Sequence, residues 1–296
     1  MYINIKCSKL KYIKCILLNF MMIIIYNKLT KSKNIKVCVC TIGKEENKYI
    51  KEFIEHYKKY RIDKIFLYDN NNIAGEKFDD ILKDFSQDGF IEIQNWRGLS
   101  SPQMMFYQDC YNKNYDKYDW LIFNDIDEFI FLKKFDNIKD FLNQFKFKKC
   151  ESIQLSWLFR TDNNLIYYEN KSLKQRFIEK DPYANERKID EYSNGKSILK
   201  GHIKNIKIMN FHCISSKLKS CDGFGRKKKI FKPDNEYYYF DHYYSKSTEE
   251  FIEKLKKGDV YKGKIDEKII KYFNYNKITI EKIKYLGAKL FNSSIK

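Results

Sequence analysis

Proline and glycine are both scarce in this chain of 296 residues, which contains 3 prolines and 11 glycines. That composition argues against low-complexity linkers between folded parts. Because 43% of the residues are hydrophobic and 17% are aromatic, the composition also excludes an intrinsically disordered protein. The length suits one large domain, or one domain with additions, and is sufficient for a sizeable core.

Several patterns that would indicate other classes of protein are missing from the sequence. None of the eight cysteines forms a Cys-x-x-Cys pair, and there is no RNP-type aromatic motif, zinc finger or basic zipper. We therefore expect no specific nucleic-acid partner. The cysteine spacing does not resemble a disulfide framework, so we expect reduced thiols and a reducing compartment. Cys38 and Cys40 alternate within an apolar run and are expected in the core.

Acidic residues are outnumbered by basic ones, and the formal charge is +18. A basic surface attracts nucleic acid, anionic lipid or phosphorylated substrates. A simpler explanation is a genome rich in A and T, because the abundant residue types here, Lys, Ile, Asn, Tyr and Phe, all have A/T-rich codons. The charge alone does not decide between these explanations.

The longest apolar run near the N-terminus, Ile16–Tyr26, is short and is flanked by lysines. A helix that spans a membrane needs about 20 such residues. The run suits a signal-peptide core or a helix that lies on a membrane surface, although no small-x-small cleavage site follows it. We expect residues 1–34 to associate with an anionic membrane and the protein to be cytoplasmic and peripheral to it. A single-pass anchor is the alternative.

Strand-like and helix-like patterns alternate in the first half of the chain. Short apolar runs predict strands, and apolar residues at helical spacing predict helices. The predicted strands are 35–42, 61–68, 90–96 and 120–123, and the helices between them are 45–60, 78–85 and 102–114. This order is typical of an α/β fold with a parallel sheet flanked by helices.

Polar residues lie at the carboxyl ends of three of the predicted strands. Ligands of such sheets bind beyond the carboxyl ends of the strands, so these residues are expected to converge on one site. They are Thr41, Lys44, Glu46, Asp69, Asp125, Asp127 and Glu128.

The Asp125-x-Asp127 pair is the most informative of these residues. Strand alternation places both carboxylates on one side, where they repel each other unless a cation lies between them. Oxygen ligands of this kind suit Mg²⁺ or Mn²⁺. An isolated Asp-x-Asp pair also fits a solvated turn, and Glu128 also fits a helix N-cap. The context therefore decides.

The second half of the chain has a more mixed pattern. Helices are predicted at 138–145 and 248–257, a strand at 152–159, and an amphipathic helix over the last thirty or so residues. The segments 175–180 and 196–211 are basic with strand-like pieces, and 237–244 is aromatic. Ser247 and Glu250 have the spacing of a capping box. We divide the chain into an N-terminal segment 1–34, a main domain 35–260 and a basic helical extension 261–296.

Four blocks of the sequence, in order, resemble glycosyltransferase family 92 and related family 2-like enzymes. They are KEENKYIKEFI at 44–54, IFLYDN at 65–70, the block from Gln103 through Tyr107, Cys110 and Trp120 to DIDEF at 125–129, and HYYSKSTEEFIEK at 242–254. The resemblance runs from about Val37 to Gly258. This chain departs from the family pattern at Glu45, where Asn is usual, and at Phe53, where Trp is usual; the first departure affects the donor-loop contacts.

The resemblance implies a GT-A fold, with a nucleotide-binding α/β half followed by a mixed acceptor-binding half. It also implies a nucleotide-sugar donor, often UDP-galactose, a divalent metal such as Mn²⁺ or Mg²⁺, and inversion at the anomeric carbon. A divalent ion would neutralise the departing diphosphate.

On this resemblance, Asp127 is the first-choice metal ligand and Asp125 serves the metal or the ribose. His242 is the third ligand, with His212 as its rival. The residues expected to bind the nucleotide-sugar are Thr41, Lys44, Glu46, Asp69 and Asp125.

Inversion requires a base that accepts the proton of the acceptor hydroxyl. The candidates are Asp162, ranked first, Asp222 and Asp241. Trp157 and Arg160 are expected near the acceptor, a glycan or glycolipid.

Two other functions fit parts of the sequence. One is a non-catalytic basic module that binds an anionic membrane or nucleic acid. The other is a nucleotidyl- or phosphotransferase on the same type of sheet, although the segment from Thr41 to Lys44 is not a Walker loop.

Overall fold

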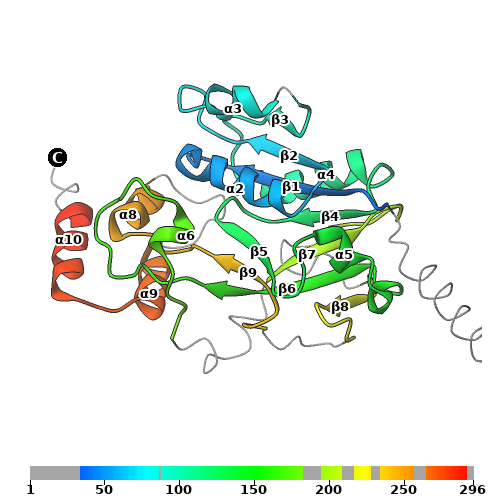
Figure 1. The fold of residues 1–296 in the computed structure, drawn as a ribbon. Coiled ribbons are helices and arrows are strands. Elements are labelled where there is room, and N and C mark those ends of the chain that lie inside the picture. Colours follow the sequence, from blue (N-terminus) through cyan, green and yellow to red (C-terminus); the bar gives the residue numbers. More distant parts are fainter. Residues whose placement is uncertain are drawn as a thin grey trace, which may run out of the picture. The chain divides into compact units, whose positions relative to one another are not determined.

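The computed structural model describes residues 34–86, 88–182, 195–208, 217–227, 234–256 and 265–291. From Lys36 onward the chain forms one compact unit. A single mixed β-sheet lies at its centre, with helices packed around it (Figure 1). The predicted α/β class is confirmed.

The first half contains every predicted strand and helix, with ends shifted by no more than three residues. The elements are β1 (Val37–Gly43), α2 (Asn47–Lys59), β2 (Lys64–Asp69), α3 (Phe78–Ser86), β3 (Ile91–Asn95), α4 (Gln103–Asn114) and β4 (Trp120–Phe123). The four strands are parallel, in the order β3-β2-β1-β4. The largest shift is at β2, because Arg61 has a left-handed backbone (φ 58°) in the turn after α2.

The second half extends the same sheet in mixed directions. Its elements are β5 (Glu128–Leu132), α5 (Ile138–Leu142), the 3₁₀ turn η1 (Phe145–Phe147), β6 (Ser152–Phe159), α6 (Leu173–Arg176), β7 (Gly195–Lys200), β8 (Ser220–Asp222), β9 (Tyr238–His242), α8 (Thr248–Lys256), α9 (Ile265–Tyr275) and α10 (Ile280–Phe291). Strand β7 runs antiparallel to β4, and the order continues β7-β6-β9-β5, with β8 beside β6. Strand β5 was not predicted.

Packing between α4 and the sheet explains why the first strands read as continuous apolar runs. Every residue of β1 and β4 is buried, as expected for parallel strands that are covered on both faces. Phe106 and Tyr107 of α4 pack with Leu121 and Phe123 of β4 in one apolar cluster. The carboxyl ends of these strands are therefore held in fixed positions.

The prediction that the cysteines lack disulfide bonds was wrong for four of them. Cys40 on β1 pairs with Cys110 on α4, and Cys150 pairs with Cys221 on β8. The partners are 70 and 71 residues apart in sequence, but their Cα atoms lie 6.5 and 6.0 Å apart because the sheet topology brings them together. Cys38 is free and buried, as expected, and burial raises the pKa of its thiol.

The C-terminal helices α9 and α10 belong to the same compact unit as the sheet, and the division of the chain at residue 260 stays a prediction. Phe251 and Leu255 of α8 pack with Tyr272 of α9 and Leu286 of α10 in a second apolar cluster. The predicted amphipathic end of the chain therefore forms two helices that complete the domain.

No helix in the described part of the chain is long and apolar enough to cross a membrane. The predicted membrane-associated stretch, Ile16–Tyr26, lies outside the described residues.

Candidate active site

The acidic loop after β4 lies beside the end of β1, as the sequence predicts. Strand β4 ends at Phe123, and β5 begins at Glu128. A methyl group at Gly43, the last residue of β1, would overlap the side chain of Ile126. Glycine at this position therefore allows the loop to approach the end of β1.

Asp127 is the centre of a group of cationic and polar side chains. Its side chain is 8% exposed, and its Oδ1 lies 3.7 Å from His242 Nε2. Its Oδ2 lies 3.3 Å from Lys254 Nζ and 3.6 Å from Lys246 Nζ. Burial opposes ionisation of Asp127, but Lys254 and Lys246 outweigh it and hold the pKa of the carboxyl well below its usual value. Asp127 is therefore an anion that nearby positive charge stabilises.

His242 reaches Asp127 because β9 pairs with β5, with His242 directly opposite Glu128. The ring lies among aromatic side chains, 4.9 Å from Trp157 and 5.0 Å from Phe159 between centroids. Burial lowers the pKa of His242 well below its usual value, although Asp127 opposes this shift. The imidazole is therefore neutral, which is the form that binds metals.

Asp125 and Glu128 share a buried lysine that the sequence analysis did not identify. Lys196 Nζ lies 2.9 Å from Asp125 Oδ2 and 3.7 Å from Glu128 Oε2, and it donates a hydrogen bond to the Tyr107 hydroxyl at 3.1 Å. Burial disfavours the ammonium ion, but the two acids raise the pKa of Lys196 well above its usual value. In the sequence, Lys196 is distinguished only by its position after Gly195, at the start of a basic, strand-like segment.

Glu128 connects the two halves of this loop. Its Oε2 accepts a hydrogen bond from the backbone N–H of Asp125 at 2.9 Å, which fixes the turn. Its Oε1 is buried without a hydrogen bond to any described residue and lies 4.0 Å from His242 Nε2. Burial raises the pKa of Glu128 well above its usual value, and Lys196 opposes this shift.

Two of the three residues predicted to bind a metal ion lie close together, and the binding itself stays a prediction. Asp127 and His242 face each other, and one carboxylate with one neutral imidazole is a donor set that suits Mn²⁺. Asp125 instead turns toward Lys196. Among the described residues, no three acidic, histidine or cysteine side chains are arranged to hold an ion as they stand. A bound ion would therefore take further ligands from its substrate or from water.

Glu46, in the loop that precedes α2, lies beside Lys246, and its contact with the nucleotide-sugar stays a prediction. Its Oε2 lies 3.3 Å from Lys246 Nζ, and the same ammonium group approaches Asp127. Lys44 is partly buried in the loop between β1 and α2. Residues about 200 positions apart in the sequence therefore meet here.

The other two predicted nucleotide-binding residues have evident structural surroundings. Thr41 is fully buried within β1, and its hydroxyl has no hydrogen bond to a described residue. Asp69 accepts hydrogen bonds from the backbone N–H groups of Asn71 at 2.9 Å and Phe78 at 3.4 Å. Asp69 thus stabilises its own turn, the structural alternative for an Asp at a strand end, and its nucleotide contact stays a prediction.

Two of the three candidate bases lie in ion pairs that do not include Asp127. Asp162 is 1% exposed and pairs with Lys282 on α10 at 2.6 Å. Asp222 pairs with Arg226 at 2.7 Å and lies beside the first half of β6, at the end of that strand away from the site. The structure does not bring either carboxylate to the proposed ligands.

The third candidate, Asp241, lies next to His242 on β9, but strand alternation directs the two side chains to opposite faces. Its Oδ1 accepts a hydrogen bond from Arg160 Nε at 2.6 Å. Burial raises the pKa of Asp241, and Arg160 opposes this shift. Trp157 contacts the site through His242, whereas His212, the rival ligand, lies outside the described residues.

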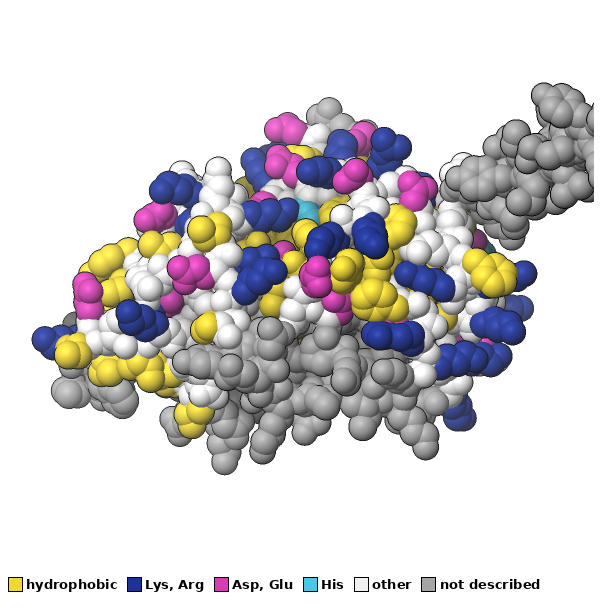
Figure 2. Space-filling model, turned by 60° about the horizontal axis from the view of Figure 1, so that its bottom comes forward, with side chains coloured by type: hydrophobic (Ala, Val, Ile, Leu, Met, Phe, Trp, Pro, Cys, Tyr) yellow, Lys and Arg dark blue, Asp and Glu magenta, His cyan; other side chains and the backbone are white. Residues whose placement is uncertain are grey.

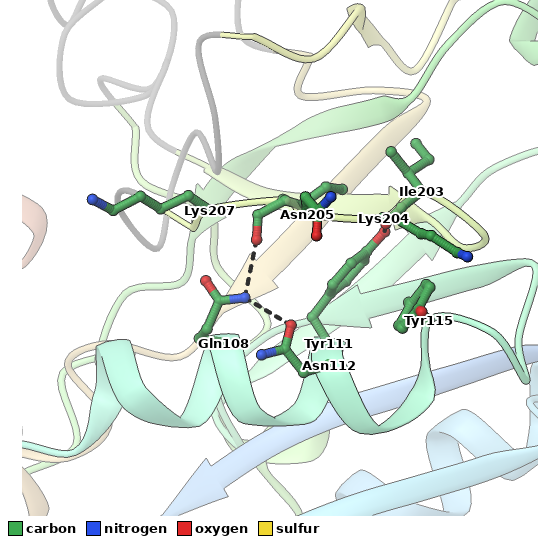
Figure 3. A pocket seen from close by; sticks show the side chains of 9 residues that line it. Gln108, Tyr111, Asn112, Tyr115, Ile203, Lys204, Asn205 and Lys207 are labelled. Carbon is green, nitrogen blue, oxygen red and sulfur yellow. Dashed lines mark hydrogen bonds between the residues drawn. The ribbon is translucent and has the colours of Figure 1, made fainter.

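A separate cavity of about 480 Å³ lies between α4 and the segment after β7 (Figure 3). It is lined by Gln108, Tyr111, Asn112, Tyr115 and residues 203–207. Gln108 donates hydrogen bonds to the Asn112 side chain and to the Ile206 carbonyl across it. None of the predicted site residues lines this cavity.

Basic side chains are spread across the face shown in Figure 2, with acidic side chains among them. This distribution is typical of a solvated surface in a lysine-rich protein. On this face it gives no separate support to the basic-module function.

The model of glycosyltransferase family 92 matches residues 33–281, which is most of the chain. The chain belongs to glycosyltransferase family 92. A family 92 protein of Oryza sativa subsp. japonica is 25% identical over 124 residues, covering 42% of this chain and 21% of that protein. A family 92 protein of Ricinus communis is 24% identical over 106 residues, covering 36% and 19%. The matched part of this chain spans about a fifth of the length of either relative.

Solved structures of the S. aureus protein TarS, residues 1–349, are similar to this family 92 chain. The complex with UDP has a TM-score of 0.41 at 13% identity and covers 86% of this chain and 70% of that one. The complex with UDP-GlcNAc has a TM-score of 0.38 at 14% identity and covers 86% and 80%.

Proposed function

We propose that this protein is a hexosyltransferase that moves a sugar from a UDP-sugar to a glycan or glycolipid acceptor, with inversion. Membership of family 92 supports transfer of a sugar. The observation that carries the proposal is the meeting of Asp127 and His242 at the carboxyl edge of the sheet, within 3.7 Å. Galactose is the first donor sugar to test, because the family resemblance implies it.

We also propose that Asp127 and His242 hold Mn²⁺ or Mg²⁺. A divalent ion there would supply positive charge to the departing diphosphate. Asp125 and Glu128 support that site from the side, since Lys196 fixes both in place. The ribose contact proposed for Asp125 remains compatible with its partly exposed side chain.

The test is UDP release from a panel of UDP-sugars with Mn²⁺, comparing wild type with Asp127→Ala. A matched control is Asp88→Ala, since Asp88 lies in an exposed ion pair with Lys58. We expect release that requires the metal, is lost in Asp127→Ala and is kept in the control. Turnover without metal, or full activity of Asp127→Ala, would contradict the proposed site.

A binding assay separates this function from that of a basic module. UDP with Mn²⁺ should raise the melting temperature if both bind the native state. No shift at saturating concentrations, together with steeply salt-dependent binding to anionic vesicles or nucleic acid, would favour the basic module.

Association of residues 1–34 with an anionic membrane, and a cytoplasmic location peripheral to it, stay proposals. The two disulfides weigh against the reducing compartment, because disulfides persist mainly in oxidising ones. Thiol labelling of the protein isolated from its cell, with and without reductant, would decide the redox state.

A further inference from the structure

We propose that Lys246 and Lys254 bind the diphosphate of the donor, exchanging Asp127 for the phosphate oxygens when the donor arrives. This inference rests on the proposed function. Both ammonium groups lie within 3.6 Å of one oxygen of Asp127. If that carboxylate ligates a metal ion, each ammonium group loses one of its anionic contacts, and a diphosphate beside the ion supplies a replacement.

Lys246 is held in a conformation that a lysine rarely adopts. Its side chain is 4% exposed, and its φ is 53°, in the left-handed region. Non-glycine residues in that region are uncommon, cluster at functional sites and persist only where the surroundings enforce them.

Hydrogen bonds of the residues on both sides of Lys246 hold its backbone in this conformation. The Ser245 hydroxyl accepts a hydrogen bond from Asn276 Nδ2 at 2.7 Å. The Ser247 backbone N–H donates to Glu250 Oε2 at 3.0 Å, and the Ser247 hydroxyl accepts from the Glu250 backbone N–H at 3.3 Å, which is the predicted capping box. The backbone of Lys246 is thus fixed at both ends, and its side chain is directed at the site.

The ammonium group of Lys246 lies between acids from two separate segments. It is 3.3 Å from Glu46 Oε2 and 3.6 Å from Asp127 Oδ2, and it stands 4.2 Å from the centre of the Tyr49 ring. These contacts keep the cation at the entrance of α2, where the loop after β1 meets the acidic loop. An anionic group in that loop region is within its reach.

Lys254 approaches the same carboxylate from α8. Its Nζ lies 3.3 Å from Asp127 Oδ2, 3.4 Å from the Tyr244 carbonyl oxygen and 4.3 Å from the centre of the Tyr244 ring. Its side chain is 22% exposed, so part of it is accessible to a ligand. Two lysines side by side suit a ligand with adjacent phosphates, because lysine binds phosphate as a point charge.

Lys196 serves as the contrast within the same site. Its side chain is 1% exposed and is enclosed by Asp125, Glu128 and Tyr107. Its acids are Asp125 and Glu128, and neither is the carboxylate that Lys246 and Lys254 share. We therefore assign Lys196 to the support of the loop and the two other lysines to the ligand.

The experiment measures binding of UDP and UMP by calorimetry with Mn²⁺ present. Lys246→Met and Lys254→Met should each weaken UDP binding by about 10- to 100-fold, the usual loss for one charge-assisted contact. UMP, which lacks the second phosphate, should lose much less, so the preference for UDP over UMP should shrink. Lys246→Arg keeps the charge and should therefore retain part of the preference for UDP over UMP.

Two further variants control for folding and for net charge. Lys246→Gly removes the side chain but relaxes the left-handed backbone, so it should fold normally and still lose UDP affinity. Lys48→Met removes a lysine that pairs with Glu253 at 2.8 Å outside the site, and it should bind UDP like wild type.

The outcomes separate this inference from the proposed function. If wild type binds UDP and both Lys246→Gly and Lys254→Met bind it equally well, the diphosphate role is wrong while the transferase proposal stands. Equal losses for UMP and UDP would also overturn the diphosphate role. If wild type fails to bind UDP at all, the proposed function fails, and this inference with it.

Discussion

Asp162→Asn should destabilise the protein by about 3–5 kcal/mol, the usual effect of leaving a buried charge without its partner. The Asp162 carboxylate pairs with Lys282 Nζ and accepts a hydrogen bond from the Tyr272 hydroxyl, both at 2.6 Å. Both charged side chains are 1% exposed. In the variant, the acceptors that the ammonium group keeps among the described residues are neutral, the Lys277 carbonyl at 2.9 Å and the Asn164 side chain at 3.4 Å.

That loss should lower the melting temperature by about 6–20 °C, at about 2–4 °C per kcal/mol for a domain of this size. Circular dichroism during heating measures it. Asp162→Asn with Lys282→Met removes the unpaired charge, so the double variant should regain most of the stability. The double variant should also release UDP, because Asp162 then affects activity only by stabilising the fold.

The opposite pattern would restore Asp162 as the catalytic base. In that case Asp162→Asn melts close to wild type but releases no UDP, and the double variant stays inactive although it is folded. Asp162 would then accept the acceptor proton despite its burial.

Three other perturbations test the fold. Replacing Cys40 and Cys110 by serine removes a cross-link over 70 residues, so denaturant titration should show a loss of about 4 kcal/mol, whereas Cys38→Ala should lose less. Gly195→Ala forces a methyl group into the β6 backbone and should cost about 1–3 kcal/mol in the same assay. Burial opposes ionisation of Glu250, but hydrogen bonds to Arg176 and to its other partners lower the pKa of Glu250 to about 2. Up to about 3 kcal/mol of stability should therefore be lost as the pH falls from 4.5 toward 2.

Each of these has a result that would count against it. Unchanged stability of the Cys40 and Cys110 double serine variant would mean that the bridge constrains nothing. A Gly195→Ala protein with wild-type stability would contradict the close contact of β7 with β6. Because the pKa of Glu250 is lowered in the folded protein, the stability that Glu250 contributes is lost as the pH falls. Glu250→Gln should therefore make stability depend less on pH in the acid range, and an unchanged pH dependence would assign acid unfolding to other groups.

Local sequence patterns predicted those elements of the fold whose defining residues lie close together in the sequence. The strand Trp120–Phe123 and the strand Ser152–Phe159 match the predicted ranges at both ends. The capping box at Ser247 predicted the start of α8 because its hydrogen bonds join residues three apart. Such short-range interactions are visible in sequence.

Long-range partners were predicted only where the family resemblance placed them. The resemblance proposed His242 beside Asp127, and the structure brings the two together. Neither the Cys40–Cys110 bridge nor the ion pair that occupies Asp162 has a local signature. Lys196 was missed for the same reason, because its acids lie about 70 residues earlier, in the loop after β4 and at the first residue of β5.

The position of β9 determines when this site can exist during synthesis. Strand β9 lies between β6 and β5 in the sheet, although it is the last in sequence of the strands in the described part of the chain. Until it leaves the ribosome, β5 and β6 have open edges, and unpaired edges are prone to association with other chains. The nascent protein is therefore most exposed to aggregation just before its final strand inserts, and the same insertion delivers His242 to Asp127.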